Sequence, residues 1–231
     1  MVAAVAAGLL LAAVPLSAQA PTAPGAQAAR FVVVLDAAHG GDEVGAALGA
    51  GQNAQQNQTE KAFTLAFAGR LRALLTARGI TVVLTRDNDT AVDAGRRAEV
   101  ANRARAQACV SLHASMSGNG IHLYASSLTP AEATRLAAWK TAQAAYVTRS
   151  LKLAGDLNAA LAHAGVPVSI GRTALVGMDS MACPAVAVEL APLAAAGQTK
   201  ASAVTDAAYQ ARVAQALAAA LVEWRAEGQQ P

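Results

Sequence analysis

Hydrophobic positions along the chain fall into two patterns that alternate from residue 31 onward. Short continuous runs, rich in β-branched residues or alanine, predict buried strands at Phe31–Asp36, Thr81–Thr85, Cys109–His113, Ile121–Ala125, Ala174–Gly177 and Ala185–Leu190. Between them, apolar residues recur at helical spacing and predict helices at Phe63–Leu75, Asp93–Ala106, Ala131–Ala164 (two helices) and Gln198–Arg225. Because strands alternate with helices, we expect an α/β fold, a three-layer sandwich around a largely parallel, twisted sheet.

The first 29 residues differ in composition from the rest of the chain. The apolar run Val2–Val14 precedes the small residues Ser17–Ala20, a pattern typical of a secretory signal peptide. An uncleaved membrane anchor is the alternative, although the run is short for a transmembrane helix. We therefore predict a signal peptide at 1–20, a flexible linker at 21–29 and a single domain at 30–231. The mature protein is expected to be periplasmic or secreted, without stable membrane insertion.

The overall charge and composition narrow the possible partners. The 231 residues include 18 Lys and Arg against 15 Asp and Glu, which gives a formal net charge of +3. The arginines are dispersed and aromatic residues make up only 3% of the chain, so we predict no nucleic-acid partner. A mildly basic surface is compatible with an anionic polymer. The 54% hydrophobic content reflects abundant alanine and does not predict a multi-span membrane protein.

Two cysteines, Cys109 and Cys183, lie at the starts of predicted buried strands. Export would permit a disulfide between them. Two buried, unreactive thiols are the interpretation that we favour from the sequence.

Polar residues follow three of the apolar strand runs. His39, His113 and Glu189 each lie at or just after the end of a strand, where open α/β sheets bind their ligands. Glu60 begins the predicted Phe63 helix, where the helix dipole favours an anion. Each residue alone has an ordinary explanation: a turn histidine, a helix-terminal charge, or a carboxylate paired with an arginine. Together, two imidazoles and a carboxylate form a typical catalytic zinc site, and Glu189 is then the candidate proton shuttle.

Four segments resemble, in order, the zinc-dependent N-acetylmuramoyl-L-alanine amidases of the family-3 type, which act on peptidoglycan. They are VVLDAAHGG, TEKAFTLAFAGRLRALLTARGITVVLTRDND, RRAEVANRARAQACVSLHAS and PAVAVEL. The resemblance implies that His39, Glu60 and His113 bind Zn²⁺ and that Glu189 is the catalytic glutamate. It also implies that residues 30–231 are a catalytic amidase domain. The expected reaction is hydrolysis of the amide between N-acetylmuramic acid and L-alanine.

The chain also departs from the pattern of this family. Ala37-Ala38 replaces Pro-Gly, Ser115 replaces Asn, and Ala191-Pro192-Leu193 follows the catalytic glutamate, which puts the floor of the substrate groove in doubt. Ser115 and Arg86 are further candidates for substrate binding, although an internal pairing suits Arg86 better.

Residues 129–150 look like an insertion. Some relatives of this type carry an occluding helix that a protein activator withdraws; an ordinary packing helix is the alternative. Two other functions stay open, a zinc hydrolase acting on another cell-wall amide and a non-catalytic wall-binding or regulatory homologue.

Overall fold

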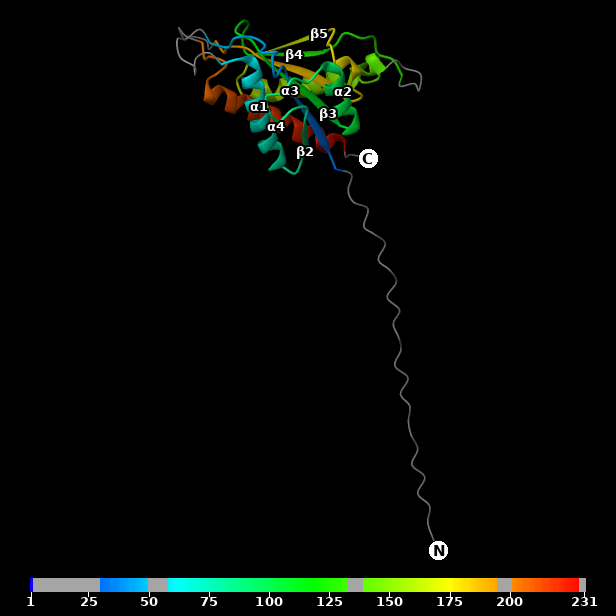
Figure 1. Ribbon diagram of the computed structural model, residues 1–231. Helices are drawn as coiled ribbons and strands as arrows, with labels where there is room; N and C mark the ends of the chain where they lie inside the picture. Colours follow the sequence, from blue (N-terminus) through cyan, green and yellow to red (C-terminus); the bar gives the residue numbers. More distant parts are fainter. Residues whose placement is uncertain (2–29, 50–57, 133–138, 195–200, 229–231) are drawn as a thin grey trace.

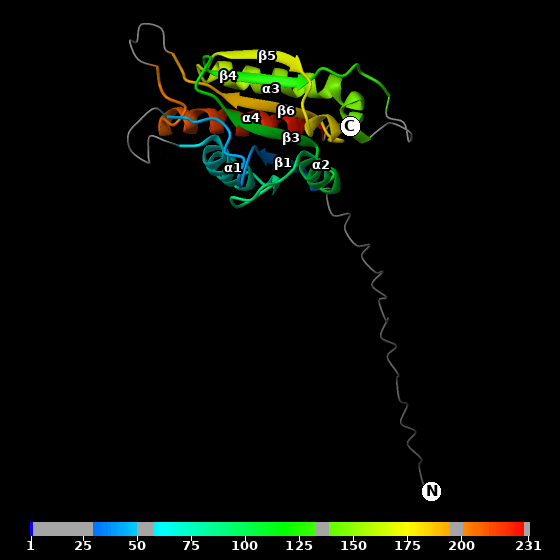
Figure 2. The ribbon, with the colours of Figure 1, turned by 45° about the horizontal axis from the view of Figure 1, so that its top comes forward.

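The computed structural model describes residues 1, 30–49, 58–132, 139–194 and 201–228 (Figure 1). The predicted signal peptide and linker thus lie almost wholly outside the described residues. A six-stranded sheet has the order β2-β1-β3-β6-β4-β5 (Figure 2). Its strands are β1 (Val32–Ala37), β2 (Thr81–Leu84), β3 (Ala108–Ala114), β4 (Ile121–Ser126), β5 (Val168–Thr173) and β6 (Ala185–Leu190).

The predicted α/β fold is confirmed, but the sheet is mixed. β2, β1, β3 and β6 run parallel to one another, while β4 pairs antiparallel with β6 and parallel with β5. The reversal follows from the short connection of residues 115–120 between β3 and β4, because a parallel return requires a crossover of a dozen or more residues. The longer segment between β4 and β5 contains a helix and restores the parallel relation.

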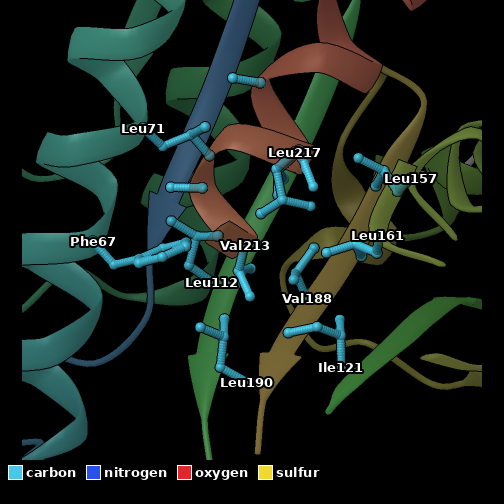
Figure 3. Packing of buried hydrophobic residues seen from close by; sticks show 14 of the residues in the cluster. Phe67, Leu71, Leu112, Ile121, Leu157, Leu161, Val188, Leu190, Val213 and Leu217 are labelled. Carbon is cyan, nitrogen blue, oxygen red and sulfur yellow. The ribbon is translucent and has the colours of Figure 1, made fainter. Parts of the chain in front are cut away.

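Helices cover both faces of the sheet. α1 (Glu60–Thr76), α3 (Val147–His163) and α4 (Ala207–Gly228) pack on one face, where Phe67, Leu157 and Leu217 meet the strand residues Leu112 and Val188 (Figure 3). α2 (Ala94–Arg103) and two short 3-10 helices, η1 (Trp139–Ala145) and η2 (Met178–Ser180), lie on the other side of the molecule. This second layer is smaller and leaves part of its face open.

Two predicted boundaries were wrong. The last strand but one is Val168–Thr173, whereas Ala174–Gly177 is a loop in which Val176 is 91% exposed. β5 is a sheet edge with mostly exposed side chains, so a search for apolar runs passes over it. The last helix begins at Ala207, nine residues later than predicted, where the Asp206 carboxylate accepts a hydrogen bond from the Tyr209 N–H at 2.7 Å.

The two cysteines form a disulfide, which corrects our preference for free thiols. Cys109 is the second residue of β3 and Cys183 precedes β6, and the Cα atoms lie 6.2 Å apart. The sequence could not reveal this proximity because β6 is inserted beside β3 only through the sheet topology. The disulfide is buried in the smaller core between the sheet and α2.

The described parts of the predicted insertion are residues 129–132 and 139–150, and residues 133–138 lie outside the described residues. The Gln143 side chain is buried and donates to the carbonyls of Met181 and Cys183 at 2.8 and 2.7 Å. These contacts lie before the amino end of β6, whereas Glu189 lies near its carboxyl end. Gln143 therefore anchors this segment before the amino end of β6, and an occluding role of residues 129–150 stays a prediction. Within the described chain, no helix has the length and apolar character needed to cross a bilayer.

Candidate metal centre and active site

Three side chains from distant segments converge at the carboxyl ends of β1 and β3. In His39, Glu60 and His113, one ligand atom of each residue lies within 4.8 Å of the others. His39 Nε2 is 3.0 Å from Glu60 Oε2, and His113 Nδ1 is 3.1 Å from Glu60 Oε1. The two rings are nearly perpendicular, with centroids 5.6 Å apart. Two nitrogens and a carboxylate oxygen directed at one point are a ligand set suited to catalytic zinc.

Local structure explains how each ligand reaches this point. His39 follows β1 with a φ of 62°, a left-handed conformation that turns the chain sharply out of the sheet. Glu60 is the first residue of α1, as predicted, so its carboxylate lies at the positive end of the helix dipole. His113 is the second-last residue of β3 and points to the face opposite the main hydrophobic core.

Glu60 is held as a buried anion. Burial alone would raise the pKa of its carboxyl group. Hydrogen bonding with His113, the backbone N–H groups of Ala46 and Ala114, and the nearby His39 imidazole together outweigh burial and lower that pKa from 4.5 to about 2. The side chain is only 7% exposed. A permanently ionised carboxylate between two imidazoles has the charge that a divalent cation requires.

The described residues Gly45 and Ala46 lie against Glu60. Gly45 has a φ of +66°, and a Cβ atom there would lie 2.7 Å from both Glu60 Oε2 and His39 Cδ2. No side chain larger than hydrogen fits in this position. The buried His39 Nδ1 has no hydrogen bond of good geometry, although Glu43 Oε1 lies 3.2 Å away. The contact of Glu43 with His39 was not predicted from the sequence. The available signal was its position four residues after His39.

Glu189 lies beside one of the three candidate ligands, His113, in the sheet. In the β3–β6 register it is the direct neighbour of His113, so both side chains project from the same face. A cavity of about 340 Å³ adjoins the group, with His39, His113 and Glu43 among its lining residues. Its other walls come from the start of α2 and the loop at 174–178, with Val92, Ala94, Leu175 and Met178 contributing apolar surface. A candidate metal site, a carboxylate and a mostly apolar cavity close together suit hydrolysis of a bound amide.

Comparison with known proteins decides the family. A family model described as N-acetylmuramoyl-L-alanine amidase matches residues 33–223. The chain belongs to this family. An N-acetylmuramoyl-L-alanine amidase of Mycobacterium tuberculosis is 33% identical over 201 residues, which cover 79% of this chain and 81% of that protein. The amidase AmiA of Escherichia coli is 40% identical over 83 residues, 36% of this chain and 27% of its own.

Solved structures agree with the family. The catalytic domain of the amidase CwlV from Paenibacillus polymyxa superposes with a TM-score of 0.62 at 26% sequence identity, covering 85% of this chain and 98% of that domain. The helix-covered mixed sheet is thus an amidase fold.

Arg86, a candidate for substrate binding or for an internal pairing, is buried in this amidase family member. Its side chain is 4% exposed and donates to the carbonyl oxygens of Ala37 at 2.8 Å, Ala38 at 2.9 Å and Lys61 at 2.7 Å. The guanidinium therefore ties the segment leading to His39 to the first turn of α1. The same side chain also donates to Thr64 Oγ1 at 3.1 Å. A role of Arg86 in substrate binding stays a prediction.

Ser115 lies just beyond β3. Its hydroxyl pairs with Ser117 Oγ at 2.9 Å and accepts from the Ser117 N–H at 3.0 Å. These bonds shape the turn that leads to β4. A role in substrate binding stays a prediction.

Three buried polar residues behind the metal centre were missed by the sequence analysis. Asp36, Arg97 and Ser111 are 5%, 8% and 3% exposed. Arg97 donates to Asp36 Oδ1 at 2.6 Å and to the His39 carbonyl at 2.8 Å, while Ser111 donates to Asp36 Oδ2 at 2.7 Å. The available signal was a polar residue, Asp36 or Ser111, inside an otherwise apolar strand run.

Proposed function

We propose that this protein hydrolyses the amide bond between N-acetylmuramic acid and L-alanine in peptidoglycan, with a zinc ion bound by His39, Glu60 and His113. The observation that carries the proposal is the convergence of these three side chains within 4.8 Å at the carboxyl ends of the strands, beside Glu189. Family membership supplies the bond that is cleaved.

Zinc bound by these residues would polarise the substrate carbonyl and lower the pKa of a water molecule. The protein itself supplies the proton transfer. The Glu189 carboxylate accepts a proton from the attacking water and delivers it to the nitrogen of the departing L-alanine. The bond from carbonyl carbon to nitrogen breaks, and the products are a lactyl carboxylate and a free amino terminus. The cavity beside His39 and His113 holds the substrate so that water reaches only this carbonyl.

We further propose that the protein acts outside the cytoplasm, in the periplasm or as a secreted enzyme. The disulfide between Cys109 and Cys183 supports this location, because such bonds persist mainly in oxidising compartments. A substrate in the cell wall requires the same location. A protein activator stays a prediction.

The glutamate role is tested with Glu189→Gln, which keeps the shape of the side chain and removes its basicity. Turnover of purified peptidoglycan should fall at least ~100-fold, the usual contribution of a general base, while one zinc ion per chain is retained. Glu223→Gln on the exposed side of α4 is the matched control and should digest normally. Equal digestion by the Glu189 and Glu223 variants would refute the assignment.

The scissile bond is tested by labelling the new amino termini in a digest. The proposal requires intact stem peptides that begin with L-alanine. New termini at other residues would identify a hydrolase of another cell-wall amide. Absence of both products and of stoichiometric zinc would identify a non-catalytic homologue.

A further inference from the structure

A buried carboxylate on β1 connects the two candidate histidine ligands from behind. Asp36 Oδ2 accepts from the Ser111 hydroxyl at 2.7 Å, and Ser111 Oγ lies 3.4 Å from His113 Nε2. On its other side, Asp36 Oδ1 accepts from Arg97 at 2.6 Å, and the same guanidinium donates to the His39 carbonyl at 2.8 Å. One side chain thus reaches both histidines through one intermediate group each.

The single proton of the Ser111 hydroxyl decides which group donates in the hydrogen bond between Ser111 and His113. The Asp36 carboxylate is paired with Arg97 and only accepts hydrogen bonds, so the single Ser111 proton is given to Asp36. The serine oxygen then offers lone pairs to His113, which must carry its ring proton on Nε2 to make this bond. The other nitrogen, Nδ1, faces Glu60 Oε1 3.1 Å away, and the Nδ1 proton of this metal-free hydrogen bond is the one that a metal ion displaces, which leaves a lone pair on Nδ1. A lone pair and an anionic oxygen facing one point favour a cation between them.

We propose that Asp36, acting through Ser111, is a positioning residue that holds the Nε2–H tautomer and the ring orientation of His113, so that Nδ1 is the nitrogen that binds the metal. This inference rests on the metal site of the proposed function. Hydrogen bonds of this kind from the outer partners of ligating histidines typically change metal affinity ~10- to 100-fold when they are removed.

The chain offers a matched control for this proposal. Thr85 Oγ1 also donates to Asp36, at 2.6 Å, and no hydrogen bond joins the Thr85 side chain to either histidine among the described residues. Thr85 and Ser111 are similarly buried, at 8% and 3% exposure. Ser111→Ala and Thr85→Val therefore each remove one hydroxyl bond to the same carboxylate, but only the first breaks the link to His113.

The experiment measures the zinc dissociation constant by competition with a chromophoric chelator. Ser111→Ala should raise it ~10-fold or more, while Thr85→Val should change it less than about twofold. Ser111→Thr, which restores a hydroxyl, should recover most of the affinity. Thermal unfolding of the metal-free variants checks that Ser111→Ala and Thr85→Val are folded.

Two results would overturn the inference. One is a zinc dissociation constant of Ser111→Ala that is close to that of the parent protein or equal to that of Thr85→Val. The other is a ¹⁵N spectrum of the zinc-loaded parent in which His113 binds through Nε2, a measurement that does not depend on any variant being folded. A parent that binds no zinc would instead contradict the proposed function, so the two failures are distinguishable.

Discussion

Removal of the Cys109–Cys183 disulfide should lower the free energy of unfolding by an amount set by the size of the loop that the bond closes. The bond closes a loop with a sequence separation of 74 residues. In the chain-entropy model, a loop of this length stabilises the folded state by ~4 kcal/mol at 25 °C, because the crosslink removes conformations from the unfolded chain. For a domain of this size each kcal/mol shifts the melting temperature by ~2 to 4 °C, so we expect a decrease of about 10 °C.

The assay is thermal unfolding followed by circular dichroism, on the oxidised parent and on the Cys109→Ala/Cys183→Ala variant. Reductant should lower the parent's melting temperature and leave the variant unchanged. Zinc affinity should stay within about twofold of the parent, because the disulfide lies at the starts of β3 and β6 and the ligand His113 lies near the opposite end of β3. Parent and variant melting within about 2 °C of each other, or two titratable thiols in the unfolded, unreduced parent, would refute the reasoning.

Three further perturbations probe the metal centre. Gly45→Ala should abolish stoichiometric zinc binding, measured by metal analysis, because its Cβ would lie 2.7 Å from Glu60 and His39; normal zinc content would contradict this. Arg86→Met should lower the melting temperature and weaken zinc binding, because carbonyls leading to His39 lose a buried donor worth ~1 to 3 kcal/mol; an unchanged melting curve would refute it. The pKa of Glu60 is lowered from 4.5 to about 2, so its contribution to the stability of the metal-free protein is present above pH 4.5 and is lost as pH falls toward 2. This loss amounts to ~3 kcal/mol and should be absent in Glu60→Gln; parallel acid titrations of the two proteins would contradict it.

The sequence predicted the parts of the fold and site that depend on local patterns. Apolar runs located five of the strands, and polar residues at strand ends marked His39 and His113. The rule works because parallel strands deliver their carboxyl ends to one edge of the sheet. Apolar runs failed as a guide where long-range pairing decides the structure. β5 is an exposed edge of the sheet, and the neighbours of β6 follow from the order of the strands alone.

The hydrogen bonds of Asp36 and Ser111 could not be predicted from the sequence, because they too depend on long-range strand pairing. Asp36 and Ser111 lie 75 residues apart, and their hydrogen bond exists only because β1 and β3 pair with these two residues in register. Arg86 also depends on contacts that the sequence does not show. A charged residue at a strand end resembles a ligand-binding residue in sequence, but in the structure it is 4% exposed and serves the backbone. Burial is the property that separates the two cases.

The segment after Glu189, where the chain departs most from its family, affects packing more than chemistry. Ala191 is fully buried, and its carbonyl accepts from the Tyr209 hydroxyl of α4 at 3.0 Å. Leu193 belongs to the main core on the face opposite His113. The chain therefore leaves β6 toward the helices, and residues 191–193 are not among those that line the cavity beside His39 and His113. The cavity proposed to hold the substrate is walled by Val92, Ala94 and the loop at 174–178, so substitutions there should change substrate preference, whereas substitutions at Ala191 or Leu193 should change stability.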